Sequence, residues 1–128
     1  MLPERFIDHF QNPRNVGELP PPAIRVDATN PACGDMLRLY ARFEDDRVVE
    51  ARFQTRGCTA SLAASSALTE WMIGKSRADL AALKPATLEE MLGGLELASK
   101  HAVVLCLDAV KLLLRSNHPI VDRQKENL

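Results

Sequence analysis

The sequence lacks several features that would place it in a common functional class. Acidic and basic side chains are interspersed and nearly balanced, with a formal net charge of −1, so there is no basic stripe of the kind that binds nucleic acid. No run approaches the roughly 18 apolar residues of a membrane span. Residues 1–10 have neither the apolar core nor the cleavage site of a signal peptide. We therefore expect a cytoplasmic protein that binds neither nucleic acid nor a membrane.

Familiar catalytic arrangements are missing as well. The chain has no internal repeat, no low-complexity segment and no glycine-rich loop placed to hold a phosphate. Ser65 and Ser66 lie inside a predicted helix without a paired base, so a hydrolytic triad is not indicated. His9 and His118 have no supporting context, and we expect both at the surface. We therefore expect the protein not to be an enzyme.

Length and composition predict one domain. The chain has 128 residues, of which 46% are hydrophobic, and this is enough to bury a core without disulfides. We expect a single domain over 1–128, with its core at about 4–116 and a polar tail at 117–128. The three cysteines are odd in number and far apart, which indicates reduced thiols.

Hydrophobic periodicity predicts a sheet followed by helices. Alternation with period two predicts strands at 24–28, 37–43 and 49–55, with a hairpin turn at 44–47. Leu37 and Leu39 share one face of the second strand, as Val49 and Phe53 do in the third, which is typical of a sheet with one face in water. Helices are predicted at 3–10, 61–73, 77–83, 87–92 and 99–115. The fold class is α+β: a small antiparallel sheet of about three strands with helices packed on one face.

The segment Asn30-Pro31-Ala32-Cys33-Gly34-Asp35 is predicted to be a turn that leads into a strand. Gly34 lets the backbone fold tightly, so the side chains of Cys33 and Asp35 can converge at the end of the sheet. An ordinary Asx turn with a spare cysteine is the alternative interpretation.

The other two cysteines lie in different surroundings. Cys58 follows Gly57 at the start of a predicted helix, where unpaired N–H groups and the helix dipole favour a thiolate. The alternative is a buried cysteine that only fills space. Cys106 lies among apolar residues in the middle of the last helix, and we expect it in the core. Two thiolates and a carboxylate, with an imidazole if the fold supplies one, are ligands that zinc and iron accept.

Several long motifs occur in the chain in a fixed order. They are His9-Phe10-Gln11-Asn12-Pro13-Arg14-Asn15-Val16-Gly17; Asn30-Pro31-Ala32-Cys33-Gly34-Asp35; Gly57-Cys58-Thr59-Ala60-Ser61 continuing to Ala64-Ser65-Ser66 and Thr69-Glu70-Trp71; Gly74-Lys75-Ser76; and Lys100-His101 with Leu105 and Asp108-Ala109-Val110-Lys111. Over about residues 4–115 the chain resembles the IscU/NifU-type iron–sulfur cluster assembly scaffolds. The number and order of the motifs argue against chance agreement.

The resemblance implies a scaffold whose sheet end and helix tips hold iron, zinc or a transient [2Fe–2S] cluster. Position by position, the ligands of the family fall on Cys33, Asp35, Cys58 and His101. In the family a third cysteine serves as a cluster ligand and is implicated in accepting sulfur from a cysteine desulfurase. That position is Ala102 in this chain. Cys106 could replace the ligand only if the last helix began later or unwound by one turn.

The resemblance also implies partners. These are a cysteine desulfurase and the apo iron–sulfur proteins that receive the cluster. Residues 95–99 read Leu-Glu-Leu-Ala-Ser, where the family carries a proline-containing chaperone-recognition segment, and this argues against transfer through an Hsp70-type chaperone. We expect a monomer or a weak homo-oligomer.

Two other hypotheses stay open beside the scaffold. The first is a degenerate homologue that binds a single Zn or Fe ion and regulates or partners the desulfurase without building clusters. The second is a plain structural domain with incidental cysteines. Ala102 is the feature that separates the scaffold from the degenerate homologue.

Overall fold

The computed structural model describes residues 3–30, 34–94 and 100–116. Its elements are α1 (Glu4–Gln11), β1 (Ile24–Thr29), β2 (Met36–Glu44), β3 (Arg47–Arg56), α2 (Thr59–Met72), α3 (Arg77–Ala81), α4 (Pro85–Met91) and α5 (Lys100–Arg115). Each helix and strand predicted from periodicity is present, with ends that differ by a few residues. None of the helices in the described part is long and apolar enough to cross a membrane.

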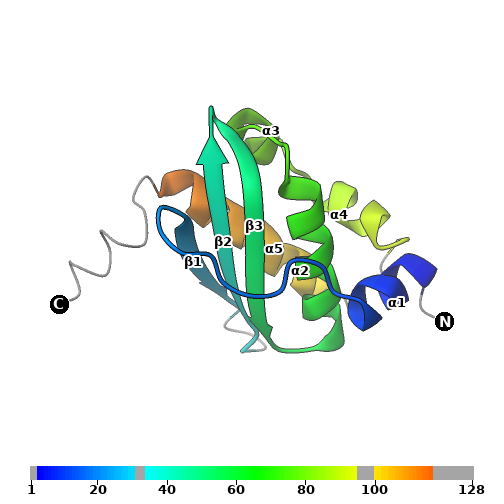
Figure 1. Ribbon diagram of the computed structural model, residues 1–128. Coiled ribbons are helices and arrows are strands. Elements are labelled where there is room, and N and C mark those ends of the chain that lie inside the picture. The colour runs from blue at the N-terminus through cyan, green and yellow to red at the C-terminus, as the bar shows by residue number, and fades with distance from the viewer. Residues whose placement is uncertain (1–2, 31–33, 95–99, 117–128) are drawn as a thin grey trace.

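The three strands form one antiparallel sheet in the order β1-β2-β3. The register places Val26 opposite Leu39 and Leu39 opposite Phe53, and all three side chains are buried. Helix α5 packs on β1 and β2, α2 packs on β3 and on α5, and α1 packs on α2. Figure 1 shows the helices gathered on one side of the sheet, with α5 behind it. The predicted α+β class is confirmed.

The valine that faces the core near the start of β3 differs from the prediction. The hairpin turn consists of Asp45 and Asp46, whose φ angles of 51° and 67° are those of the tight turn that suits the twist of a two-residue hairpin. This turn pairs Glu44 with Arg47, and Phe43 with Val48. The next pair is Arg42 with Glu50, so β3 contains one more residue than β2 at this point. The extra residue forms a β-bulge. Val48 is therefore buried and Val49 only half-buried, so the predicted inward position of Val49 is wrong.

Small residues allow α2 to lie deep in the fold. Ala63, Ala64 and Ala67 are fully buried, as are Leu68 and Met72. Because alanine and serine side chains are short, the helix axis can approach its neighbours closely on several sides. Cys58 occupies the N-cap position of α2, but its side chain makes no capping hydrogen bond. The packing of α2 thus fixes the position of the backbone at Cys58.

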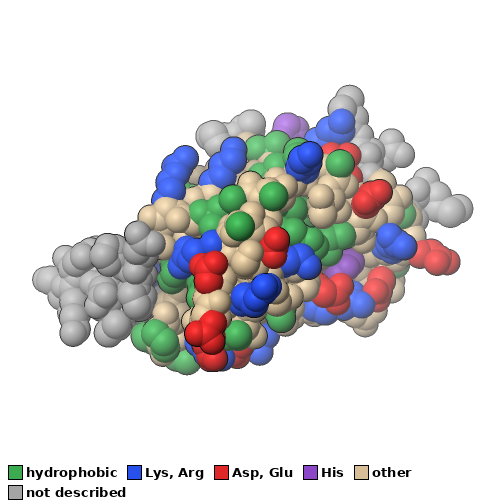
Figure 2. Space-filling model, turned by 90° about the horizontal axis from the view of Figure 1, so that it is seen from above, with side chains coloured by type: hydrophobic (Ala, Val, Ile, Leu, Met, Phe, Trp, Pro, Cys, Tyr) green, Lys and Arg blue, Asp and Glu red, His purple; other side chains and the backbone are tan. Residues whose placement is uncertain are grey.

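The outer face of the sheet is less open than the alternating pattern predicts. Tyr40 points away from the helices, as expected, but it is buried against Leu19 and Ala23. These two residues flank the proline-rich connector 20–22, which carries the chain across this face (Figure 1). On the face shown in Figure 2, acidic and basic side chains are mixed over much of the surface, as the balanced composition predicts.

The edge of β3 is paired with two segments that are not strands. Phe53 donates its N–H to Asn15 O and accepts from Gly17 N, both at 2.9 Å. Further along, Val48 donates to Lys75 O at 2.9 Å and accepts from Gly74 N at 2.8 Å. These backbone bonds fix the connections before β1 and after α2 against the sheet.

The bulge can be tested by truncating the two valines in turn. We expect Val48→Ala to lower the free energy of unfolding by about 2 kcal/mol, since it removes two buried carbon groups and leaves a cavity. Val49→Ala is the matched control and should cost clearly less. Urea denaturation of both variants measures the difference. Equal losses, or a larger loss at Val49, would contradict the register.

Candidate metal site

Asp35 stands at the end of the sheet, just before β2. A turn holds it there: Gly34 donates its N–H to Asn30 O at 2.7 Å, and Asn30 donates to Asp35 O at 2.9 Å. Gly34 has a φ of 76°, a conformation in which glycine is not strained, as expected of the residue that lets the backbone fold tightly before Asp35. The side chain of Asp35 is buried, with 9% of the residue exposed. Cys33 lies outside the described residues.

Cys58 meets Asp35 at the N-terminus of α2. Its Sγ lies 3.4 Å from Asp35 Oδ2 and its backbone N lies 3.5 Å from the same oxygen. The thiol is exposed, while the carboxylate beneath it is buried. The structure therefore brings together a thiol and a carboxylate from two segments that are 23 residues apart.

Ser61 completes this cluster, and the sequence analysis did not identify it as a site residue. Its hydroxyl donates to Asp35 Oδ2 at 2.6 Å, and its Oγ lies 3.5 Å from Cys58 Sγ. Only 1% of Ser61 is exposed, so little water competes for this hydrogen bond. The available signal was its place in the first turn of α2, three residues after Cys58.

His101 lies in the first turn of α5 and is exposed, whereas its neighbour Ala102 is buried. Among the described residues no three His, Cys, Asp or Glu side chains lie together as a set that could hold a metal ion. The structure thus brings Asp35 to Cys58 but does not add His101 to that pair.

Cys106 is a core residue, as predicted. It is fully buried, and burial raises the pKa of its thiol to about 12, against the opposing effect of a hydrogen bond with Ser65. The thiol therefore stays protonated at neutral pH, and a protonated, enclosed thiol is a poor metal ligand.

His9 is buried, so the expectation that it lies at the surface is wrong. Its Nδ1 lies 2.8 Å from Ser66 Oγ, and the same hydroxyl accepts from Arg14 N at 2.9 Å. The hydroxyl can donate its proton to Nδ1 when the imidazole is neutral and carries its own proton on Nε2. Ser66 thus has a histidine partner that the sequence analysis missed, because the two residues lie 57 positions apart.

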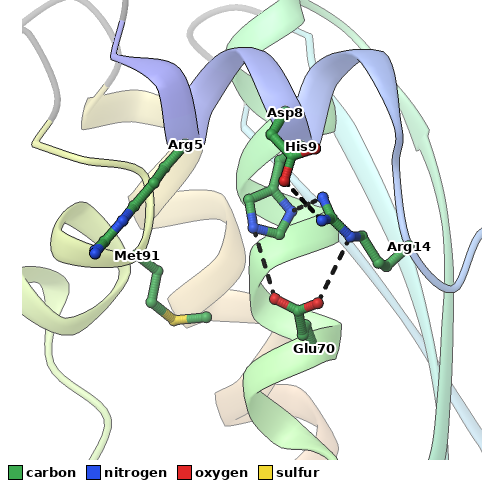
Figure 3. Close-up of a pocket in the computed structure, with 6 residues that line it drawn as sticks. All are labelled: Arg5, Asp8, His9, Arg14, Glu70 and Met91. Atoms are coloured by element: carbon green, nitrogen blue, oxygen red, sulfur yellow. Dashed lines mark hydrogen bonds and ion pairs between the residues drawn. The ribbon is translucent and has the colours of Figure 1, made fainter.

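His9 and Arg14 also line a pocket of about 310 Å³, together with Arg5, Asp8, Glu70 and Met91 (Figure 3). Arg14 forms ion pairs with the two acidic side chains of the pocket. Its Nη2 lies 2.6 Å from Asp8 Oδ2, and its Nε lies 3.6 Å from Glu70 Oε2. Ser66 is fully buried, so its hydroxyl cannot act as a nucleophile on a ligand in the pocket. The serine and histidine hold α1 against α2 and do not form a hydrolytic site.

The buried imidazole makes stability depend on pH. Burial and then the Arg14 charge hold the pKa of His9 below its ordinary value of 6.5, while Glu70 and Asp8 oppose this. As the pH falls through 6.5 the unfolded chain takes up a proton first, so the folded state loses stability until the lower pKa is reached.

We expect the free energy of unfolding of the natural chain to fall between pH 7.5 and 5.5. The slope assigned to His9 cannot exceed about 1.4 kcal/mol per pH unit. His9→Asn keeps an acceptor near the position of Nδ1 and cannot titrate, so its profile should be flatter. Urea denaturation across this range compares the two proteins. Parallel profiles would contradict the assignment.

The chain is similar to known proteins over most of its length. Residues 2–118 match the family model of the NifU-like N terminal domain. The iron–sulfur cluster assembly scaffold protein IscU of Haemophilus influenzae is 39% identical over 112 residues, which cover 84% of this chain and 88% of that protein. IscU 1 of Archaeoglobus fulgidus is 37% identical over 111 residues, which cover 87% of this chain and 72% of that protein.

Solved structures show the same fold. A putative iron–sulfur cluster assembly scaffold protein for the SUF system from Fervidobacterium islandicum has a TM-score of 0.68 at 19% identity, covering 88% of this chain and 95% of that one. A NifU-like N-terminal structure from Brucella abortus has a TM-score of 0.55 at 19% identity, covering 88% and 80%. From the family match over nearly its whole length, this chain belongs to the NifU-like N-terminal domain family.

Proposed function

We propose that this protein is an iron–sulfur cluster assembly scaffold. It holds iron, zinc or a labile [2Fe–2S] cluster as cargo and passes the cluster to apo-proteins, and it is not itself an enzyme. The observation that carries the proposal is the contact between Asp35 and Cys58 at the end of the sheet. The family membership supports it, because the relatives that match most of the chain are cluster assembly scaffold proteins.

The proposed ligands are Cys33, Asp35, Cys58 and His101. They come from the connection before β2, the N-terminus of α2 and the first turn of α5. Figure 1 shows that β2 begins at the end of the sheet where the β3–α2 connection lies. Thiolate, carboxylate and imidazole are all accepted by zinc and iron, and clusters with mixed cysteine and histidine ligation occur.

Asp35 makes this a site for temporary binding. A carboxylate is a harder ligand than a thiolate and holds soft, sulfur-rich centres less strongly. A ligand set that includes one carboxylate therefore suits a cluster that has to be released to another protein. The sulfur would come from a cysteine desulfurase, and the recipients would be apo iron–sulfur proteins. The segment relevant to an Hsp70-type chaperone, 95–99, lies outside the described residues.

Ala102 supports a second candidate function. If it replaces a ligating cysteine, the chain has one thiolate fewer for a cluster and one fewer acceptor for sulfur. The protein would then bind a single Zn or Fe ion and act on a desulfurase without building clusters. Cys106 cannot supply the missing thiolate, because it lies one turn further along α5, fully buried and with its pKa at about 12.

We expect the purified chain to bind about one divalent metal ion, and the variant Cys33→Ser/Cys58→Ser to lose it. Zinc in hundredfold excess over its dissociation constant should stabilise the natural chain by about 2.7 kcal/mol, since it binds the folded state alone. Elemental analysis and thermal unfolding with and without zinc measure both effects. Cys106→Ala is the control and should keep the metal. Unchanged metal content in the double variant would exclude the proposed ligands.

The two candidate functions separate on reconstitution with iron and sulfide under anaerobic conditions. A scaffold should develop the visible absorption of a [2Fe–2S] cluster, and Ala102→Cys should increase its yield or lifetime because a thiolate is added beside His101. A chain that binds zinc but develops no such absorption would support the single-ion function. Loss of cluster and metal in Cys106→Ala would show that the ligand assignment on α5 is wrong.

A further inference from the structure

We propose that Ser61 is a positioning residue for the metal site. Its hydroxyl fixes the carboxylate of Asp35 beside Cys58, in the space that the missing side chain of Gly57 leaves open. The inference rests on the proposed function, to which it adds two residues that are not metal ligands.

Among the described residues, three donor groups lie within hydrogen-bond distance of one oxygen of Asp35. The Ser61 hydroxyl lies 2.6 Å from Oδ2, whereas the Cys58 thiol and backbone N–H lie at 3.4 and 3.5 Å. A separation of 2.6 Å is typical of a hydroxyl that donates to a carboxylate, and such bonds are about twice as strong as neutral ones. The Cys58 contacts are long in comparison. The bond from Ser61 is the shortest of the three, and we expect it to position Oδ2.

The position of Ser61 is itself fixed by its surroundings. Ser65 donates its hydroxyl to Ser61 O at 2.7 Å, and Thr55 of β3 donates to Ser65 Oγ at 3.0 Å. Ser61 is buried in the first full turn of α2, so its one hydroxyl proton has little access to water. The sheet and the helix together aim this donor at Asp35.

Gly57 limits the carboxylate from the other side. A Cβ atom at position 57 would lie 2.4 Å from Asp35 Cγ and 2.6 and 2.7 Å from its two oxygens. These separations are far below van der Waals contact, so any side chain at this position would displace the carboxylate. Asp35 thus occupies the space that a side chain at residue 57 would fill. Gly57 and Ser61, the two residues that limit the position of the carboxylate, lie on either side of Cys58 in the sequence.

Such control matters for a metal site. Ordering a mobile carboxylate when the metal binds lowers the affinity for the metal. Groups that do not touch the metal but hydrogen-bond to its ligands commonly raise metal affinity 10- to 100-fold. Here the buried serine and the glycine pre-set the angle between Asp35 and the Cys58 thiol. The chain thus holds half of its proposed ligand set in position.

The test uses Zn²⁺ affinity and the absorption spectrum of bound Co²⁺, which reports the ligand geometry. Ser61→Ala should weaken Zn²⁺ binding by about 10- to 100-fold and change the Co²⁺ spectrum. Ser61→Thr keeps the hydroxyl and should restore both. Thr69→Ala removes a buried hydroxyl two turns further along α2, whose partners are Ser66 O and Asn15, and it should leave both unchanged. Natural affinity and spectrum in Ser61→Ala, or the same loss in Thr69→Ala, would overturn the proposal.

Glycine variants test the same point without removing a hydrogen bond. Gly57→Ala should displace the carboxylate and reproduce the spectral change of Ser61→Ala. Gly74→Ala is the control, because Gly74 also has a positive φ of 91°, but a Cβ atom added there would meet none of the described residues within 4 Å. A natural Co²⁺ spectrum in Gly57→Ala would count against the proposal.

A measurement on the metal-free protein separates this inference from the proposed function. The amide resonances of Gly57 and Cys58 report the position of the carboxylate and should shift in Ser61→Ala but not in Thr69→Ala. If they shift while Zn²⁺ affinity is unchanged, Ser61 positions Asp35 but the proposed ligand set is wrong. If neither changes, the role of Ser61 is overturned while the proposed function stands.

Discussion

The close packing of α2 is the constraint on which the rest of the structure depends. Its small residues are buried against the sheet, α1 and α5, and a longer side chain at Ala64 or Ala67 would have to displace one of these neighbours. Packing at this density does not adjust gradually, because interiors contain little free space. The helix therefore has one position in the fold, and this position fixes where the backbone lies at its two ends.

Two buried polar clusters in the described part of the protein are built on this helix. Its first turn presents Ser61 and, at the cap, Cys58 to Asp35, while its middle presents Ser66 to His9. Among the described residues no buried side-chain N or O lacks a hydrogen-bond partner, so these buried groups do not carry the cost of an unpaired polar atom. The same small hydroxyl side chains that permit close packing also bind the carboxylate and the imidazole.

Local patterns in the sequence predicted the elements but not the contacts between them. The period of the strands and helices, the turn at Gly34 and the burial of Cys106 follow from neighbouring residues. The inward turn of Val48 did not, because the bulge results from a mismatch between the hairpin turn and the sheet register. The bonds of His9 to Ser66 and of Asp35 to Ser61 join residues 57 and 26 positions apart in the sequence. Hydrophobic periodicity reports only on neighbouring residues, so it does not predict such contacts. The place of Ser61 in the first turn of α2, three residues after Cys58, was the local signal for the second bond.

The pairing of the β3 edge limits how other proteins can approach the sheet. A bare strand edge offers unpaired N–H and C=O groups to which a further strand can add, irrespective of its sequence. Near Phe53 and Val48 these groups already bond to Asn15, Gly17, Gly74 and Lys75. Strand addition along β3 would have to displace both covering segments. A partner on this side therefore has to recognise side chains, and substitutions there can alter its choice without disturbing the hydrogen bonds that hold the sheet together.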